Sequence, residues 1–146
     1  MEQTRKNLKI TSIGILIYSA FSLLSLVLEI FFGEINKAAI PADSPENILL
    51  ITKIILLTFS VLLFLPELYI GIKGLKMAKN PDSSRAHIIW ATIIFVLACI
   101  ALISPLSSIL SGDSVKSNLR SITSVAVDIA LYGEYIRIAK AVSEGR

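Results

Sequence analysis

The chain has 146 residues, of which 54% are hydrophobic and 17% are charged, and its mean hydropathy is +0.74. A soluble domain of this length could not bury so much apolar surface, because small domains keep a large surface for their volume. The formal charge of +3 does not indicate nucleic-acid binding, since the basic residues gather at the ends of apolar segments. The composition therefore predicts a single membrane-embedded domain over residues 1–146, with lipid as its surroundings.

Four apolar segments predict an all-α fold, an integral membrane four-helix bundle with helices at about 10–32, 46–76, 86–110 and 119–142. At about 1.5 Å per residue, the first segment spans roughly 34 Å, which is enough for a hydrocarbon core of about 30 Å. It also exceeds the roughly 7–15 apolar residues of a cleaved signal peptide, so we expect it to be retained. Ser44 and Pro45 are typical of the start of the second helix, and Pro66 is expected to kink that helix.

The positions of lysine and arginine predict the orientation in the membrane. Ten of the 14 basic residues lie near the N-terminus, between the second and third helices, or near the C-terminus. The other four are Lys37, Lys53, Lys116 and Arg120. Short basic segments stay on the cytoplasmic side of a membrane. We therefore expect a multi-pass protein of the cell membrane with both termini in the cytoplasm.

Each predicted helix carries one face of small or polar residues when successive residues are placed about 100° apart. In chain order, the residues on these faces are Ser12, Ser19, Ser22 and Glu29; Lys53, Ser60, Glu67, Gly71 and Gly74; His87, Ala91, Ala98, Ala101, Ser104, Pro105 and Ser108; and Ser121, Ser124, Asp128, Tyr132, Tyr135 and Ala139. Small residues let helices approach closely in lipid, and polar groups there find partners. We expect these faces to point into the bundle, although they are equally suited to contact another subunit.

Asp128 lies near the middle of the fourth predicted helix, where a charged carboxylate costs roughly 2.5–3.5 kcal/mol. Two interpretations stay open. In one, Asp128 is a proton or cation site or contacts a polar ligand. In the other, it is a structural carboxyl group bonded to Ser19, Ser22 or a neighbouring hydroxyl.

Glu67 follows the kinking Pro66 and is expected near the inner boundary, where it meets Tyr135 or Lys73. A carboxylate beside a broken helix is also typical of the ion sites of transporters. The sequence thus predicts a candidate intramembrane polar site that consists of Asp128, Glu67, Tyr132, Tyr135, Ser19 and Ser22.

The remaining polar residues are expected to be structural. Glu29 and Lys53 lie at similar depths on consecutive helices, so we expect an ion pair between them. Glu134 is expected to pair with Arg137, or with a partner protein. His87, the only histidine, is expected at the membrane interface and not on a metal, because neither a second histidine nor a cysteine cluster exists.

Aromatic residues near the inner boundary are expected to anchor the helices at the interface; they are Tyr69, Trp90 and Tyr135. The single cysteine, Cys99, excludes an intrachain disulfide and a cysteine-based zinc site. The sequence contains no catalytic, metal-binding or nucleotide-binding motif of the familiar kinds, so no cofactor is expected.

One stretch resembles a known group of proteins. Between residues 65 and 102, the pattern consists of Tyr69, Gly71, Lys73 and Gly74, then Asn80 and Pro81, then the third apolar segment. It is similar to uncharacterised small four-helix integral membrane proteins of Gram-positive bacteria. The resemblance implies a membrane fold in a bacterial cell membrane, and it implies no catalytic residue.

Function is expected to lie outside enzyme chemistry. The leading hypothesis is an accessory or partner-binding subunit that packs against another membrane protein or against itself, in contact with membrane lipid. The alternative is a small oligomeric transporter or channel that uses Asp128, with Glu67, on a polar path through the membrane. A lipid- or quinone-modifying membrane enzyme is the third hypothesis considered.

Overall fold

The computed structural model describes residues 2–32, 46–81, 84–111 and 115–145, which form helices without any strand. The helices are α1 (Glu2–Phe32), α3 (Glu46–Lys79), α4 (Ala86–Ala101), α5 (Ile103–Leu110) and α6 (Val115–Ser143). The predicted all-α class is therefore confirmed. Within the described residues, the segments Glu2–Phe32, Ile48–Lys79 and Ala86–Leu110 are long and apolar enough to cross a membrane.

Most helices are longer than the apolar pattern predicts. α1 begins at Glu2 instead of residue 10, α3 continues to Lys79, and α6 begins at Val115. The added turns at the start of α1 are polar, and there Gln3 Nε2 donates a hydrogen bond to Asn7 Oδ1 at 3.0 Å. Apolar periodicity marks only the part of a helix that lipid or a core selects, so polar turns beyond it escape prediction.

The third predicted helix is divided into α4 and α5 at Leu102. Pro105 accounts for this division, because proline has no N–H to donate to the carbonyl of Ala101. Nearby bonds still span the junction: the Leu102 amide donates to Ala98 at 3.1 Å, and the Leu106 amide donates to Leu102 at 3.3 Å. α3, by contrast, runs without interruption through Pro66, and the kink there stays a prediction.

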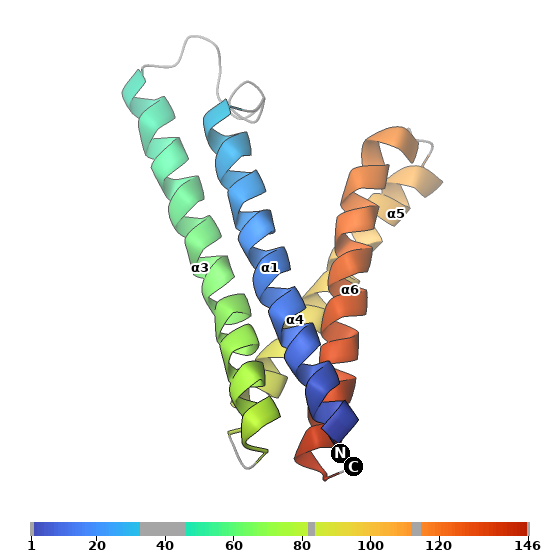
Figure 1. Ribbon diagram of the computed structural model, residues 1–146. Coiled ribbons are helices and arrows are strands. Elements are labelled where there is room, and N and C mark those ends of the chain that lie inside the picture. The colour runs from blue at the N-terminus through green and yellow to red at the C-terminus, as the bar shows by residue number, and fades with distance from the viewer. Residues whose placement is uncertain (1, 33–45, 82–83, 112–114, 146) are drawn as a thin grey trace.

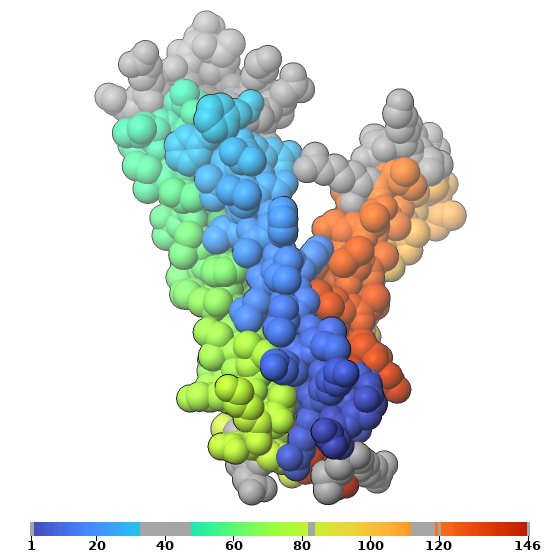
Figure 2. Space-filling view, in the orientation of Figure 1, coloured from blue at the N-terminus to red at the C-terminus, as the bar shows by residue number. Residues whose placement is uncertain are grey.

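The helices form two pairs (Figure 1). α1 packs along α3, while α4 and α5 pack against α6, and α1 also contacts α6. The start of α1, the end of α3, the start of α4 and the end of α6 lie at one end of the molecule, which we call the closed end. From there the two pairs diverge, and Figure 2 shows a hollow between α1 and α6 toward the opposite, open end.

The buried core lies at the closed end. Its largest fully buried apolar side chains are Tyr132, Tyr135, Leu8, Ile15, Ile70 and Met77, and α4 adds Ile88 and Ala91. Arg85 reinforces this end, because its Nη2 donates a hydrogen bond to the carbonyl of Ser143 at 3.0 Å. Many large apolar side chains elsewhere are exposed, as Phe21 is at 68%, and lipid is the environment that suits them.

Two glycines allow the close approach of helices at the closed end. A Cβ atom on Gly71 would lie 2.5 Å from Leu16 of α1, and one on Gly74 would lie 2.6 Å from Tyr135 Oη of α6. Both distances are too short for real atoms, so only glycine fits this packing. The predicted small face of the second helix is therefore buried at Gly71 and Gly74.

Candidate functional site: a polar cleft between the helix pairs

Three hollows with shared lining residues lie between the helices, and together we call them the cleft. The first, the α1–α3 pocket, has a volume of about 160 Å³ and is lined by Ser19, Ser22, Leu23, Leu26, Ser60, Leu63, Phe64 and Glu67. The second, the α3–α4 groove, of about 380 Å³, shares Leu63 and Glu67 with it. The third, the α1–α6 pocket, of about 430 Å³, shares Ser22 and Leu26 with the first.

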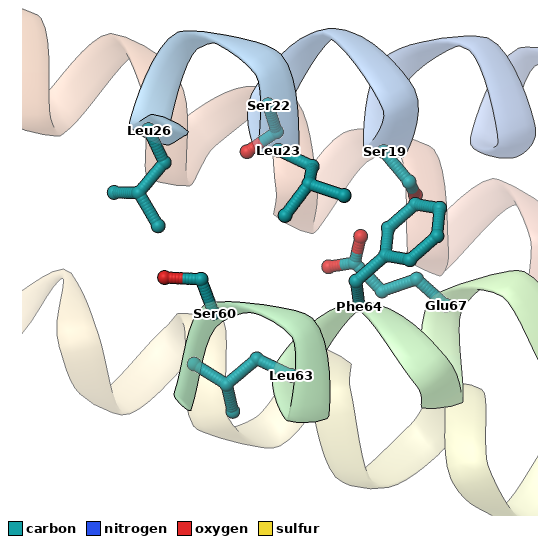
Figure 3. Close-up of a pocket in the computed structure, with 8 residues that line it drawn as sticks. All are labelled: Ser19, Ser22, Leu23, Leu26, Ser60, Leu63, Phe64 and Glu67. Atoms are coloured by element: carbon teal, nitrogen blue, oxygen red, sulfur yellow. The ribbon is translucent and has the colours of Figure 1, made fainter. Parts of the chain in front are cut away.

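Glu67 occupies the junction of the first two hollows. Figure 3 shows its carboxylate in the space between α1 and α3, on the side toward which the Ser19 hydroxyl points. The Glu67 carboxylate also faces the Tyr132 hydroxyl of α6. Ser19 and Tyr132 are 1% and 0% exposed, and neither hydroxyl makes a hydrogen bond of regular geometry within the described part of the chain. Three residues of the predicted polar site, on three different helices, therefore converge here.

Ser60 and Ser22 complete the polar lining of the α1–α3 pocket. Ser60 is 7% exposed, and its hydroxyl donates a hydrogen bond to the carbonyl of Leu56 at 2.6 Å. This bond orients the hydroxyl while its oxygen keeps lone pairs for another contact. Ser22, another residue of the predicted site, is exposed and lines both pockets.

Asp128 is half-buried on α6 and lines the α3–α4 groove together with Glu67. The hydroxyl that faces it belongs to Tyr18 of α1, which is a neighbouring hydroxyl of the kind that the structural interpretation allowed beside Ser19 and Ser22. Tyr18 Oη also lies 3.4 Å from the carbonyl of Ser124 and donates a hydrogen bond to it. Sequence analysis missed Tyr18. The signal available was its helical phase, because at about 100° per residue it falls on the same side of α1 as Ser22.

Two expected partners of Glu67 lie elsewhere. Tyr135 is fully buried in the closed-end core, and its hydroxyl donates a hydrogen bond to the carbonyl of Ile70 at 3.1 Å. The Lys73 ammonium lies 5.6 Å from the centroid of the Tyr69 ring. Tyr135 is thus a packing residue, and its expected place among the interface anchors is wrong.

His87 is also buried, which corrects the expectation of an interfacial side chain. It is 0% exposed, and its ring packs edge-on against Tyr135 with 6.1 Å between the centroids. Neither ring nitrogen makes a hydrogen bond of regular geometry with the residues that the structure describes. The first turn of α4 enters the core because small residues such as Ala91 let α4 approach α6.

The two expected ion pairs have different outcomes. Arg137 and Glu134 form a two-pronged pair on the surface of α6, with 2.8 Å from Nε to Oε2. Lys53 places its ammonium 5.8 Å from the centroid of the Phe31 ring, against the same part of α1 that carries Glu29. Glu29 itself lines the α1–α6 pocket. The pair between Glu29 and Lys53 stays a prediction.

The cleft offers oxygen ligands to whatever enters it. The carboxylates of Glu67 and Asp128 and the hydroxyls of Ser19 and Tyr18 supply them. Among the residues that the structure describes, no group of three or more His, Cys, Asp or Glu side chains is arranged to hold a metal ion. The ligand set therefore suits single positive charges and hydrogen-bond donors better than transition metals.

No protein-family model matches the chain, and searches of curated proteins and of solved structures find no similar one.

Proposed function

We propose that the chain is a non-enzymatic integral membrane protein that binds a transmembrane helix of a partner protein. In this proposal α6 is a fourth transmembrane helix, and both termini lie in the cytoplasm of a bacterial cell. Support comes from the closed end, where the described segments that carry nine of the 14 basic residues gather. The resemblance of residues 65–102 to small bacterial membrane proteins supports the same location.

The topology has a direct test. A C-terminal fusion to green fluorescent protein should be fluorescent, and a fusion to periplasmic alkaline phosphatase at the same position should be inactive. Activity of the phosphatase fusion would place the C-terminus outside and overturn the proposed orientation.

The α3–α4 groove carries the proposal of partner binding. Its walls are mostly apolar, and the small side chains of Ala98 and Ala101 allow another helix to approach α4 closely. Asp128 and Glu67 give the groove two acidic groups that lipid tails cannot satisfy. A partner helix with a lysine or arginine in its apolar stretch would complement both the shape and the charge.

Site-directed photocrosslinking in intact membranes tests this occupant. The photoreactive residue replaces Leu97, which lines the groove, or Ile89, which is 64% exposed on α4 and is not among the groove residues. We expect one defined adduct from position 97 that is absent from position 89 and is lost with Asp128→Asn. Mass spectrometry should identify a transmembrane segment with a basic residue as the crosslinked peptide.

Other outcomes contradict the proposal. Equal adducts at both positions would show that the groove is not selective, and an adduct with a second copy of this chain would indicate a homo-oligomer. An adduct that Asp128→Asn leaves unchanged would remove the charge argument.

Transport of a small solute is the second candidate function, and the continuity of the cleft favours it. Glu67, Ser22, Leu63 and Leu26 are shared between neighbouring hollows, so polar groups follow one another from the α3–α4 groove to the α1–α6 pocket. Purified protein in liposomes should then move solute, and Asp128→Asn should abolish the flux while the fold is kept. Absence of flux with a wide panel of ions would eliminate this candidate.

A further inference from the structure

We propose that the α1–α3 pocket is a binding site for an alkali cation, sodium or potassium, in which Glu67 supplies the charge and the lining hydroxyls of Ser19 and Ser60 supply neutral oxygen ligands. This inference deepens the second candidate function, because it names the class of solute. Its test measures binding and not flux, so a site that binds without transporting is distinguishable from no site.

The first argument is the pair of unsatisfied hydroxyls. Ser19 of α1 and Tyr132 of α6 are buried and face Glu67 of α3. Neither hydroxyl makes a hydrogen bond of regular geometry with another residue that the structure describes. A buried polar group without a partner costs about 1–3 kcal/mol. A cation held between the Glu67 carboxylate and the Ser19 hydroxyl would satisfy that hydroxyl.

The second argument is the charge. Glu67 is surrounded by apolar side chains such as Leu23, Leu63 and Phe64, and no lysine or arginine lines the pocket. An ionised carboxylate in such surroundings must be neutralised by a cation or by a proton. Since hydroxyl oxygens cannot supply positive charge, the pocket as built lacks the counter-charge that Glu67 requires.

The third argument is the size and valence of the occupant. One carboxylate lines the pocket, so one positive charge balances it. A water occupies about 30 Å³ in the liquid, so the 160 Å³ pocket has room for a small ion with part of its hydration shell. Oxygen ligands suit hard cations, and a singly charged one is the match for this charge count.

A proton must compete with the cation, because protonated Glu67 has no charge to offer. The titratable groups that face Glu67 are Tyr18 of α1 and Asp128 and Tyr132 of α6. Asp128 adds negative potential next to the pocket, which favours the cation further. Binding should therefore weaken as the pH falls, by up to about tenfold per unit where Glu67 is mostly protonated.

Trp90 makes the binding measurable. It is the only tryptophan, and it lines the α3–α4 groove beside Glu67. We would titrate purified protein in detergent at pH 8 with NaCl or KCl, against choline chloride at the same ionic strength. We expect a saturable change in fluorescence with an alkali cation alone, and a rise in Tm over the same concentrations, because a ligand that binds only the folded state stabilises it.

Three variants decide the assignment. Glu67→Gln should weaken the cation response at least tenfold. Ser19→Ala, a smaller change that should fold normally, should weaken it several-fold. Glu134→Gln makes the same carboxylate-to-amide change on the exposed surface of α6, and should respond like the wild type.

The proposal fails if sodium, potassium and choline act alike on both fluorescence and Tm, since ionic strength would then explain the response. It also fails if Glu67→Gln binds like the wild type.

Discussion

Gly74 gives the most direct test of the closed-end packing. In Gly74→Ala, the new methyl group would overlap Ser12 Oγ of α1, the nearest atom, and would lie 2.6 Å from Tyr135 Oη and 2.8 Å from Tyr135 Cε2. Such contacts force the ring of Tyr135 or a whole helix to move. Because Tyr135 is fully buried and bonded to the carbonyl of Ile70, any movement also disturbs that hydrogen bond.

The magnitude follows from three effects. Overpacking of a filled core costs about 1–3 kcal/mol. Loss of the bond from Tyr135 to Ile70 adds about 0.5–1.5 kcal/mol. Alanine is favoured over glycine in a helix by about 1 kcal/mol, which offsets part of the loss. We therefore expect Gly74→Ala to lower the free energy of unfolding by about 2 kcal/mol.

Gly14 supplies the matched control. A Cβ atom there would meet only Leu131 Cδ1, at an ordinary 3.8 Å. Gly14→Ala should therefore leave the free energy of unfolding unchanged or raise it by up to about 1 kcal/mol. Both variants would be unfolded reversibly in mixed detergent micelles and followed by circular dichroism. Equal stability of the two variants would refute the close packing of α3 against α6.

A double-mutant cycle identifies the clash. Tyr135→Phe removes Oη, the nearer of the two Tyr135 atoms, while Tyr135 Cε2 and Ser12 Oγ stay in place. In the Tyr135→Phe background, Gly74→Ala should thus cost less than it does in the wild type, with a coupling energy of roughly 0.5–2 kcal/mol. Strict additivity would show that the methyl group is accommodated elsewhere.

Three further predictions follow from single side chains. His87→Phe keeps the edge-on contact with Tyr135 and removes two unpaired buried nitrogens, so it should stabilise the protein by about 1–2 kcal/mol in the same unfolding assay. A loss of stability would indicate that the imidazole has a partner. Arg137→Gln breaks an exposed ion pair and should change the unfolding midpoint by no more than the experimental error, so a clear fall would contradict its surface character. Asp128→Leu should raise the membrane insertion of an isolated α6 segment, measured by glycosylation mapping, because the exchange is worth roughly 3–4 kcal/mol at a helix centre. Equal insertion of both segments would show that Asp128 does not limit it.

The helices were predictable because lipid-facing residues carry a strong and local signal. A run such as that of α3 is apolar on all sides, so its identity as a membrane-spanning candidate needs no knowledge of its neighbours. The positions of the helix ends were predicted less accurately, since the polar turns after Glu2 depend on hydrogen bonds and not on burial. The division of the third predicted helix at Leu102 could have been predicted, because Pro105 is present in the sequence.

The candidate site was predicted in part for a similar reason. Helical phase predicts which polar residues share a face of each helix, and Ser19, Glu67 and Tyr132 lie close together in the structure. Phase says nothing about where two helices cross, however, so Tyr135 was assigned to the site although it lies in the core. Tyr18 was missed because an aromatic ring in an apolar run is typical of a lipid-facing residue. The role of its hydroxyl becomes evident only from its hydrogen bond to the carbonyl of Ser124 in α6.

The two ends of the molecule differ for a reason that bears on both proposed functions. At the closed end, glycine and alanine at positions such as Gly74, Ala91 and Ala139 let four helices meet around one core. Toward the open end, the faces turned to the cleft carry hydroxyls and carboxylates, which do not pack into a dry core without partners. The helix pairs are joined where packing is tight and separated where polar groups face the cleft. Under both proposed functions, an occupant of the cleft would change the separation of the pairs at the open end without unpacking the core that holds them together.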